Sequence, residues 1–460
     1  MGATQHNGLY KADNFIYFQK LRLQTETKMK SGIEMGAGME QQEKNEIRLE
    51  LPEKVRQIIE QIQKHGFEAY AVGGCVRDSL LGRTPDDWDI TTSAKPQEVK
   101  AIFPRTIDTG IEHGTVTVMM GKEGFEVTTY RIDGAYLDGR HPESVEFSSN
   151  LVEDLKRRDF TINAMAYNEQ QGLVDVFEGI EDMQRKVIRC VGNPKERFGE
   201  DALRMMRAIR FSAQLGFEIE EETYRAVEEL APTLEKVSME RIQVELVKTL
   251  LSAHPDYVRF YQETGLFCDV LPQADVILSG KFKNPTLKLL THAKNTSVLR
   301  YAALFYHAGP DTAKEALKRL KLDNYTVNTV SKLLLYTQKS IEENEPAVRE
   351  ATYTYGKEMM PLIFAHQHAL LDTTEELVGI GMTTKRRHLE TVERMYEDII
   401  KRGDCISIKD LDITGNDLME YGLTGTQIGK TLKDLLHIVL ENPKLNEKET
   451  LVAMIEHLDL

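Results

Sequence analysis

The sequence predicts an α+β domain in the N-terminal half, in which helices accompany a mixed sheet, followed by an all-α region. Between about residues 51 and 186, short β-rich runs alternate with amphipathic helical patterns. Beyond about residue 187, nearly every apolar pattern has helical spacing and no short repeat recurs. With 460 residues, the chain is long enough for about three domains.

Composition indicates a soluble globular protein. Hydrophobic residues make up 41% of the chain, no apolar run approaches the length of a membrane span, and no signal peptide is predicted. The four cysteines are far apart and form no CxxC pair, which predicts reduced thiols and a cytoplasmic location rather than disulfides or a zinc site. The net charge of −15 is unusual for a nucleic-acid binder, so any RNA-binding surface should be local.

The first segments of the chain differ sharply in pattern. Residues 1–47 are polar, rich in Met and Glu and without periodicity, so we expect a poorly ordered extension. From Leu51 the apolar spacing predicts an amphipathic helix, with Val55, Ile58, Ile59 and Ile62 on its buried face. Ala69–Val72 then has the composition of a short buried strand.

A glycine turn follows this strand. The Gly73–Gly74 pair allows a sharp bend and a close approach to a ligand. Val76–Leu81 has helical spacing, and Gly82 is a natural stop. A strand that passes through glycines into a helix presents unpaired N–H groups, which favour phosphate.

Two aspartates separated by one residue, Asp87 and Asp89, come next. On a strand their carboxylates would point to the same face, and two converging carboxylates suit Mg²⁺ when substrate phosphates complete its shell. A polar strand end with two solvated acids would explain this pair alone. The Gly-Gly turn, together with Arg77 and Asp78 upstream, favours the metal and phosphate site.

The next segment predicts a helix and two further strands. Pro96 fits the first turn of a helix that ends near Phe103. Gly114–Met119 and Phe125–Arg131 are strand-like. On the second of these, Glu126 is either a third carboxylate near the metal or a solvated strand acid.

A loop and a basic segment complete the α+β region. Residues 132–152 are rich in Gly, Pro and charge, which predicts a long loop with a function. Further on, Arg157, Arg158 and Asp159 should precede a helix with an apolar face formed by Phe160, Ile162 and Met165. Arg158 either binds a triphosphate and stabilises charge on the transferring phosphorus or belongs to a surface charge cluster.

A second chemical signal occurs within Lys195–Gly216, where charged residues recur at every third position of an apolar helix: Asp201, Arg204, Arg207 and Arg210. A solvated face would recur at about 3.6 residues. This line suits a base at one end and phosphates at the other, although an internally salt-bridged helix is the alternative. Other helical segments are expected at Met239–Leu251, Tyr301–Phe305, Leu317–Leu335, Glu390–Ile400 and Ile428–Leu440.

An Asp/Arg pair can select bases. A carboxylate only accepts hydrogen bonds and a guanidinium only donates them. Cytosine and adenine both offer an amino donor next to a ring-nitrogen acceptor, so Asp201 and Arg204 could satisfy either base. Uracil and guanine present a carbonyl and a ring N–H instead, and the unpaired groups would cost on the order of 1–3 kcal/mol each.

The glycine turn and the Asp87–Asp89 pair resemble the signature of the nucleotidyltransferase superfamily that includes CCA-adding tRNA nucleotidyltransferases and bacterial poly(A) polymerases. From about Leu51 onward, the order of segments resembles a class II bacterial CCA-adding enzyme. The resemblance implies an extension (1–47), a nucleotidyltransferase head (48–186), a helical neck (187–252), a helical body (253–375) and a helical tail (376–460).

The resemblance also implies roles for individual residues. Asp87 and Asp89 would be catalytic and hold Mg²⁺, and Asp201 and Arg204 would be the amino-acid template for the base. The remaining nucleotide-binding residues would be Gly74, Arg77, Arg158, Arg207 and Arg210. The tRNA 3′-hydroxyl would attack the α-phosphate of CTP or ATP, and pyrophosphate would leave.

The expected partners are tRNA, CTP and ATP, with a homodimer by resemblance. Candidate cations for tRNA are Lys281, Lys283, Lys288 and Lys385–Arg387, although solvated side chains are the simpler explanation for each. A poly(A) polymerase, or an enzyme that adds only part of CCA, shares every motif, and the complete 132–152 loop favours full addition. A non-catalytic RNA-binding protein and a nucleotide sensor are the more distant alternatives.

Overall fold

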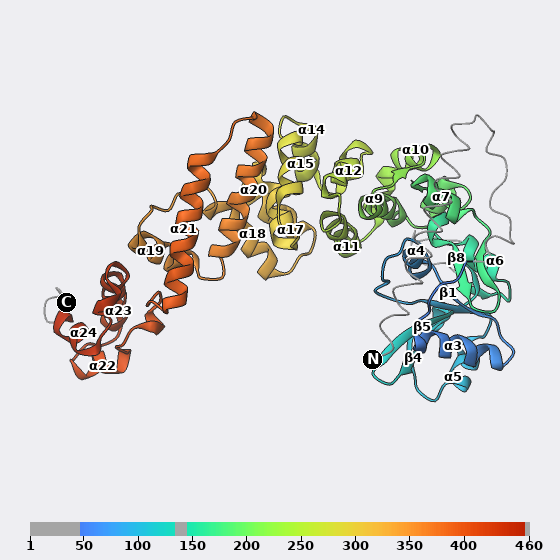
Figure 1. Ribbon diagram of the computed structural model, residues 1–460, viewed down its shortest axis with the longest axis horizontal. Coiled ribbons are helices and arrows are strands. Elements are labelled where there is room, and N and C mark those ends of the chain that lie inside the picture. The colour runs from blue at the N-terminus through green and yellow to red at the C-terminus, as the bar shows by residue number, and fades with distance from the viewer. Residues whose placement is uncertain (1–46, 134–144, 456–460) are drawn as a thin grey trace. The chain divides into compact units, whose positions relative to one another are not determined.

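The computed structural model describes residues 47–133 and 145–455. The chain divides into two compact units, one formed by residues up to 253 with 263–270 and the other by 254–262 with 271 onward (Figure 1). The predicted extension lies outside the described residues up to residue 46. The finer division into head, neck, body and tail stays a prediction.

The first unit is built around a mixed seven-stranded sheet with the order β3-β4-β5-β2-β1-β8-β9. Only β2 and β5 are parallel neighbours, and every other adjacent pair is antiparallel. This mixed sheet confirms the predicted α+β class. The strands are β1 (Ala69–Val72), β2 (Ile90–Thr92), β3 (Thr106–Gly110), β4 (Thr115–Met120), β5 (Glu123–Thr129), β8 (Met165–Asn168) and β9 (Gly172–Asp175).

Short helices cover this sheet. In α3 the predicted apolar face is buried, and the helix packs against β1. Figure 1 shows α3 and α5 on one side of the strands and α4 on the other. The helices are α3 (Glu53–Lys64), α4 (Gly74–Leu80), α5 (Pro96–Ile102), α6 (Leu151–Lys156) and α7 (Gly179–Arg185).

Two expectations between residues 131 and 168 were wrong in part. The ends of the predicted loop form an antiparallel ribbon of β6 (Arg131–Asp133) with β7 (Val145–Phe147), and α6 begins at Leu151. The predicted helix after Asp159 is instead a 3₁₀ turn, Thr161–Asn163, followed by β8. Strand pairing overrides the helical spacing here, because β8 bonds to β1 on one side and β9 on the other.

The rest of the first unit is almost entirely helical, as predicted, apart from a parallel pair of two-residue strands, β10 (Val187–Ile188) and β11 (Glu218–Ile219). The predicted Lys195–Gly216 helix is broken at Asp201, whose φ of −146° is extended. Asp201 therefore precedes α9 rather than lying on it. The helices are α8 (Pro194–Glu200), α9 (Leu203–Leu215), α10 (Glu221–Leu230), α11 (Met239–Leu250) and α13 (Phe267–Val270), with a 3₁₀ helix at Ala231–Lys236.

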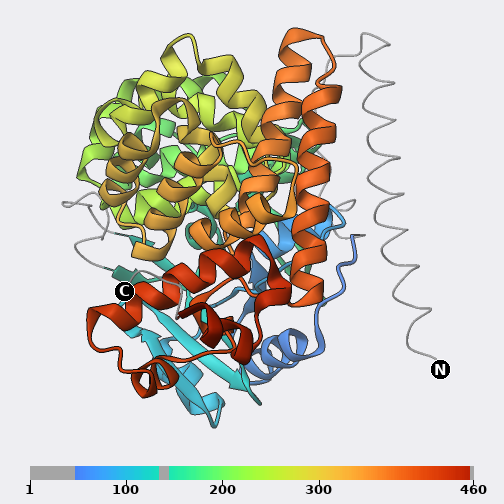
Figure 2. The same ribbon diagram turned by 90° about the vertical axis from the view of Figure 1, so that its left-hand side faces the viewer.

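The second unit is all helical within the described range. The predicted Leu317–Leu335 helix is interrupted, because the chain turns through Lys321 at a φ of 60°. The helices are α12 (Arg259–Glu263), α14 (Pro272–Ser279), α15 (Lys283–His292), α16 (Ser297–Phe305), α17 (Pro310–Arg319), α18 (Asn324–Tyr336), α19 (Glu345–Tyr355), α20 (Met360–Val378), α21 (Thr383–Arg402), α22 (Gly415–Glu420), α23 (Thr426–Glu441) and α24 (Lys448–Ile455). The long helices α20 and α21 lie side by side (Figure 2).

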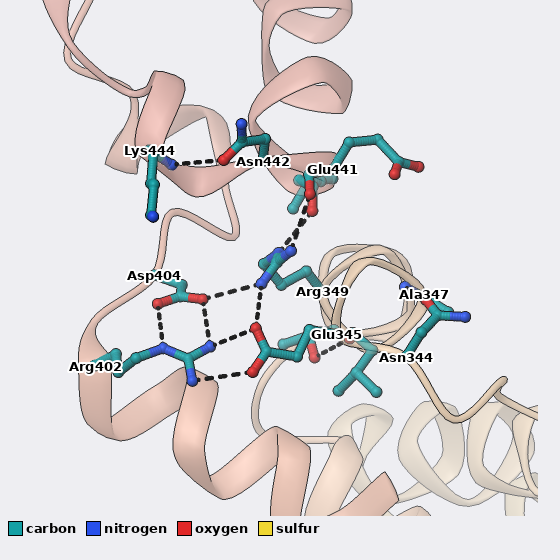
Figure 3. Close-up of polar contacts among 12 residues, drawn as sticks. Asn344, Glu345, Ala347, Arg349, Arg402, Asp404, Glu441, Asn442 and Lys444 are labelled. Carbon is teal, nitrogen blue, oxygen red and sulfur yellow. Dashed lines mark hydrogen bonds and ion pairs between the residues drawn. The ribbon is translucent and has the colours of Figure 1, made fainter.

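A buried arginine of the second unit links α19 to the end of α23 and to the segment after α21 (Figure 3). The Arg349 side chain of α19 donates to the carbonyl oxygens of Leu440 and Glu441 at 2.6 and 3.1 Å, at the end of α23. It also pairs with Glu345 at 3.1 Å and with Asp404 at 3.2 Å. Next to this junction, residues 405–455 form an apolar cluster that includes Leu418, Leu435 and Leu451.

No helix within the described ranges is long and apolar enough to cross a membrane.

Candidate active site

The two predicted metal-binding aspartates lie just before β2, not on a strand. Asp87 and Asp89 belong to a segment without regular secondary structure, and the ladder between β2 and β5 begins only at Ile90. The backbone of Asp89 is nevertheless fixed beside β1, because its carbonyl accepts a 3.0 Å hydrogen bond from Val72 N–H. Both aspartates line a cavity of about 800 Å³.

Glu126 of β5 lines the same cavity. Burial raises the pKa of Glu126, and the charges of Asp89 and Asp87 raise it further. Burial also raises the pKa of Asp89, where Arg158 opposes the rise and Asp87 adds to it. Mutual repulsion among these carboxylates is the condition that a bound cation relieves.

The carboxylates do not form a complete metal cage. Among the described residues, no three His, Cys, Asp or Glu side chains are grouped closely enough to hold an ion. Mg²⁺ is commonly bound by one or two carboxylates, with water and substrate phosphates as the other ligands. The Asp87–Asp89 pair fits that arrangement, and Glu126 lies close enough to act through its charge.

The glycine turn places the Gly73 backbone next to the Arg158 guanidinium. Gly73 adopts a φ of 82°, and a Cβ at this position would lie 2.8 Å from Arg158 Nη1. The positive φ therefore favours glycine, and any side chain at this position would displace the Arg158 guanidinium. Gly74 begins α4, where no side chain caps the helix, and a Cβ there would meet only Arg77 Nη2, at 3.7 Å.

Arg158 forms an ion pair with a buried aspartate. Asp154 is 0% exposed, pairs with Arg157 at 2.7 Å and Arg158 at 3.5 Å, and accepts a hydrogen bond from the Thr91 hydroxyl. Burial alone would raise the pKa of Asp154, but the two arginines outweigh it and the net shift is downward. Because its side chain is only 19% exposed, Arg158 does not belong to a surface charge cluster.

Three predicted nucleotide-binding arginines surround one phenyl ring. The guanidinium carbons of Arg77, Arg207 and Arg210 lie 5.0, 5.4 and 3.9 Å from the centroid of Phe211. Arg77 also donates to Asn163 Oδ1 at 2.5 Å. The ring keeps the three cations close together, and each also has a carboxylate partner: Asp78 for Arg77, Asp159 for Arg207 and Glu245 for Arg210.

The Arg207 side chain has a buried counterion, Asp159, at 2.5 Å. Burial would raise the pKa of Asp159, but Arg207 and the Asn163 side chain lower it to about 2. Conversely, burial lowers the pKa of Arg207, whereas Asp159 and Glu245 raise it, with a net rise. Both groups are therefore charged at neutral pH.

The two predicted base-selecting residues are held by different partners. Arg204 pairs with Glu200 and donates to the carbonyl oxygens of Arg197 and Arg157 at 3.1 and 3.2 Å. Asp201 instead pairs with Arg241 of α11, at 2.7 Å. Asp201 and Arg204 therefore do not neutralise each other.

Several of these supporting residues were missed by the sequence prediction: Asp154, Asn163, Glu200, Phe211, Arg241 and Glu245, the last of which pairs with Arg210 at 2.5 Å. Glu200 stands within the charged run of the sequence and could have been found there. Arg241 and Glu245 could not, since their helix only shows apolar periodicity. Their role depends on the packing of α11 against α9.

The candidate cations of the second unit have different surroundings. Lys288 pairs with Glu376, and Arg386 pairs with Asp372 and Glu375. Lys281 lies over the Phe282 ring at 4.9 Å, and Lys283 begins α15. Lys385 and Arg387, at the start of α21, are exposed and have no carboxylate partner within residues 47–133 and 145–455.

Three family models match successive parts of the chain. Residues 69–189 match the "Poly A polymerase head domain", residues 216–278 the "RNA and SrmB-binding site of polymerase A", and residues 293–455 the "tRNA nucleotidyltransferase domain 2". The first match contains the acidic pair, the glycine turn and Arg158.

Full-length relatives are similar over most of the chain. The CCA-adding enzyme of Streptococcus suis is 37% identical over 414 residues, which cover 87% of this chain and 95% of the relative. The CCA-adding enzyme of Enterococcus faecalis is 38% identical over 407 residues, which cover 86% and 93%.

Solved structures share the fold. The Bacillus stearothermophilus CCA-adding enzyme in complex with CTP is 33% identical, with a TM-score of 0.70, over 87% of this chain and 96% of that chain. The Thermotoga maritima CCA-adding enzyme complexed with tRNA is 23% identical, with a TM-score of 0.59, over 89% of this chain and 97% of that chain, and shows likeness of fold alone.

Proposed function

The chain belongs to the family of CCA-adding enzymes, and we propose that it builds and repairs the 3′-terminal CCA of tRNA from CTP and ATP. The observation that supports this most strongly is the position of Arg158. Its charge acts on Asp89, and its guanidinium lies beside the Gly73 turn. An acidic metal side and a basic phosphate side therefore adjoin, as nucleotidyl transfer requires.

Asp87 and Asp89 are proposed to hold Mg²⁺, with substrate phosphates as further ligands. When bound, the ion would offset triphosphate charge and make the attacking hydroxyl easier to deprotonate. Glu126 is proposed to act through its charge from the adjacent strand, since its pKa responds to both aspartates.

The arginines are proposed to bind the triphosphate. Arg77, Arg207 and Arg210 gather around Phe211, and Arg158 lies at the glycine turn, where Gly74 leaves room for a phosphate. In the reaction, the 3′-oxygen of tRNA bonds to the α-phosphorus and the bond to the pyrophosphate oxygen breaks. The arginines would stabilise the negative charge that accumulates on the departing pyrophosphate.

Asp201 and Arg204 are proposed to read the incoming base. The Asp201 carboxylate would accept from the amino group of cytosine or adenine, and the Arg204 guanidinium would donate to the ring nitrogen. Uracil and guanine would leave both groups unpaired. The protein itself then takes the place of a nucleic-acid template.

The all-helical second unit is proposed to bind tRNA by shape and phosphate contacts. Lys385 and Arg387 are the proposed phosphate contacts, because they are exposed and unpaired within the described residues. We place the reaction in the cytoplasm, where the four free cysteines would stay reduced. The homodimer expected from the family is a further proposal, which sedimentation analysis would test.

Incubation with tRNA that lacks its 3′ end, Mg²⁺ and each nucleotide tests the function directly. We expect C from CTP alone, CCA from CTP with ATP, and almost nothing from UTP or GTP. A ladder of adenylates would establish a poly(A) polymerase instead, and a stop after CC would establish a partial enzyme. Bound but unextended tRNA would contradict the proposal.

A further inference from the structure

The Asp201 carboxylate is fixed by a neighbouring helix. Arg241 of α11 donates from Nη1 to Oδ1 at 3.2 Å and from Nη2 to Oδ2 at 2.7 Å, which makes a two-pronged pair. The backbone N–H of Leu203 donates to Oδ1 at 3.1 Å. Because both prongs are occupied, the plane of the carboxylate is determined and not only its position.

This arrangement leaves the Asp201 carboxylate free to accept one more hydrogen bond. A carboxylate offers about four acceptor positions, two on each oxygen. The contacts of Arg241 and Leu203 use both positions on Oδ1 and one on Oδ2. The remaining position on Oδ2 has a fixed direction, and an amino group of cytosine or adenine could donate to it.

Without Arg241, the carboxylate would have a competing partner. The charge of Asp201 already contributes to the raised pKa of Arg207, so the two side chains are within electrostatic reach. An unrestrained Asp201 would turn toward that arginine, which the proposed function assigns to phosphate binding. It would then neither accept from a cognate base nor repel a carbonyl of the wrong one.

The Asp201–Arg241 pair differs from an ordinary link between helices. α9 and α11 already have such a link in Arg210–Glu245, whose side chains are 8% and 6% exposed. In the Asp201–Arg241 pair the side chains are 16% and 24% exposed, so one edge of the carboxylate remains accessible. A second link would not need that access.

We propose that Arg241 is a positioning residue for base selection: it aims the Asp201 carboxylate so that only an amino group satisfies it. This inference rests on the proposed function. It assigns to α11 a part in choosing CTP and ATP over UTP and GTP. Arg241 acts through Asp201 and contacts no base itself.

The test is a comparison of kcat/KM for CTP and UTP, with the full-length protein and tRNA that lacks its CCA end. In Arg241→Lys the charge remains but the fork is lost. We expect the CTP/UTP ratio to fall roughly 10- to 100-fold, the range that one charge-assisted hydrogen bond supports. Arg241→Gln should lower the ratio at least as far, and KM for CTP should change more than kcat.

Arg189→Gln is the matched control. Arg189 pairs with Asp182 at 3.1 Å and Glu220 at 3.6 Å in the same unit, and neither of these carboxylates pairs with an arginine proposed to bind nucleotide. This control should lower the melting temperature without changing the CTP/UTP ratio.

Each outcome is decisive. An unchanged ratio in both Arg241 variants would overturn the proposal, as would a loss of folding in both, which would assign Arg241 to structure alone. If the unmodified protein fails to add C, the proposed function fails first. If the unmodified protein adds C and the Arg241 variants reject UTP as strongly as it does, only the role of Arg241 fails.

Discussion

Arg207 and Arg241 of the first unit differ from Arg349 of the second in how accessible their ion pairs are. In the first unit, Arg241 and Arg207 pair with carboxylates beside a site that remains partly open. In the second, Arg349 is 2% exposed, and it pairs with two carboxylates and donates to two backbone carbonyls at the end of α23 (Figure 3). The first network leaves accessible edges for a ligand, whereas the second is closed.

The difference indicates what each network is for. A buried ion pair gains little stability over apolar packing, so it needs another reason to be retained. In the first unit we propose ligand binding as that reason, because the Arg207–Asp159 and Arg241–Asp201 pairs keep partly exposed side chains. In the second unit it is geometry, because one side chain satisfies two carbonyl oxygens at a helix end, where the helix itself supplies no donors.

The largest expected effect is on the acidic pair. Asp87→Asn should lower kcat by on the order of 10⁴-fold or more, since it removes a proposed metal ligand. It should leave the melting temperature unchanged or higher, because it removes one charge that raises the pKa of Asp89 and Glu126. Single-turnover CTP incorporation and calorimetry check both. A fall in melting temperature with activity retained would contradict the proposal that Asp87 serves metal binding at a cost in stability.

Mutation of the Arg349 network should have the reverse effect: it should lower stability and leave nucleotide binding unchanged. Arg349→Met leaves two carbonyl oxygens without their donor and takes from Glu345 and Asp404 the buried one of their two arginine partners. It should lower the free energy of unfolding of the second unit by about 3–5 kcal/mol. CTP affinity should not change, because every proposed nucleotide residue belongs to the first unit. Urea unfolding and equilibrium CTP binding measure the two effects.

Arg402→Met is the control for that variant. Arg402 pairs with the same carboxylates, Glu345 and Asp404, but its side chain is 45% exposed. An exposed pair should contribute about 1 kcal/mol or less. Equal losses in the two variants would show that burial of Arg349 is not what matters.

A buried histidine provides a pH test of the second unit. His366 of α20 is 0% exposed, and neither ring nitrogen has a hydrogen-bond partner among the described residues. Burial lowers its pKa from 6.5 to about 4. The unfolded chain therefore binds a proton that the folded chain does not, and stability falls as the pH decreases from 6.5 to 4.

The expected loss over that interval is about 3 kcal/mol. His366→Met, which is apolar and fills a similar volume, should remove this contribution. The difference in unfolding free energy between the two proteins, measured at pH 7 and pH 4, isolates it from carboxylates that titrate in the same range. A difference that does not vary with pH would show that His366 finds a partner when protonated.

Much of this arrangement could be predicted from local sequence. β1, α4 and α5 were located from apolar runs, Gly82 and Pro96, because strand burial and helix ends are local properties. The acidic pair and the charged line before Gly216 were also visible as motifs. Each depends on residues that lie close together in the chain.

The remainder depended on pairing between distant segments. Phe160 to Met165 has helical spacing, but β8 forms because β1 and β9 are there to bond with it. The break at Asp201 could not be inferred either, because the pair that holds its carboxylate comes from Arg241, forty residues later. The motif residues proposed for the reaction could therefore be predicted, whereas the distant residues that orient them, such as Arg241, could not.

The smallest expected effect concerns tRNA binding by α21. Replacing Lys385 and Arg387 together with Gln should weaken tRNA binding by roughly tenfold, about 1.4 kcal/mol, and reduce the slope of log K against log salt by about 1–2. Lys288→Gln is the control, because Lys288 is already paired with Glu376 at 2.5 Å and should release few counterions. Binding of tRNA measured over a range of salt concentrations compares them. If Lys288→Gln changes the salt slope as much as the double variant, tRNA displaces Glu376, and the second unit's charge pairs are as open to ligands as those of the first.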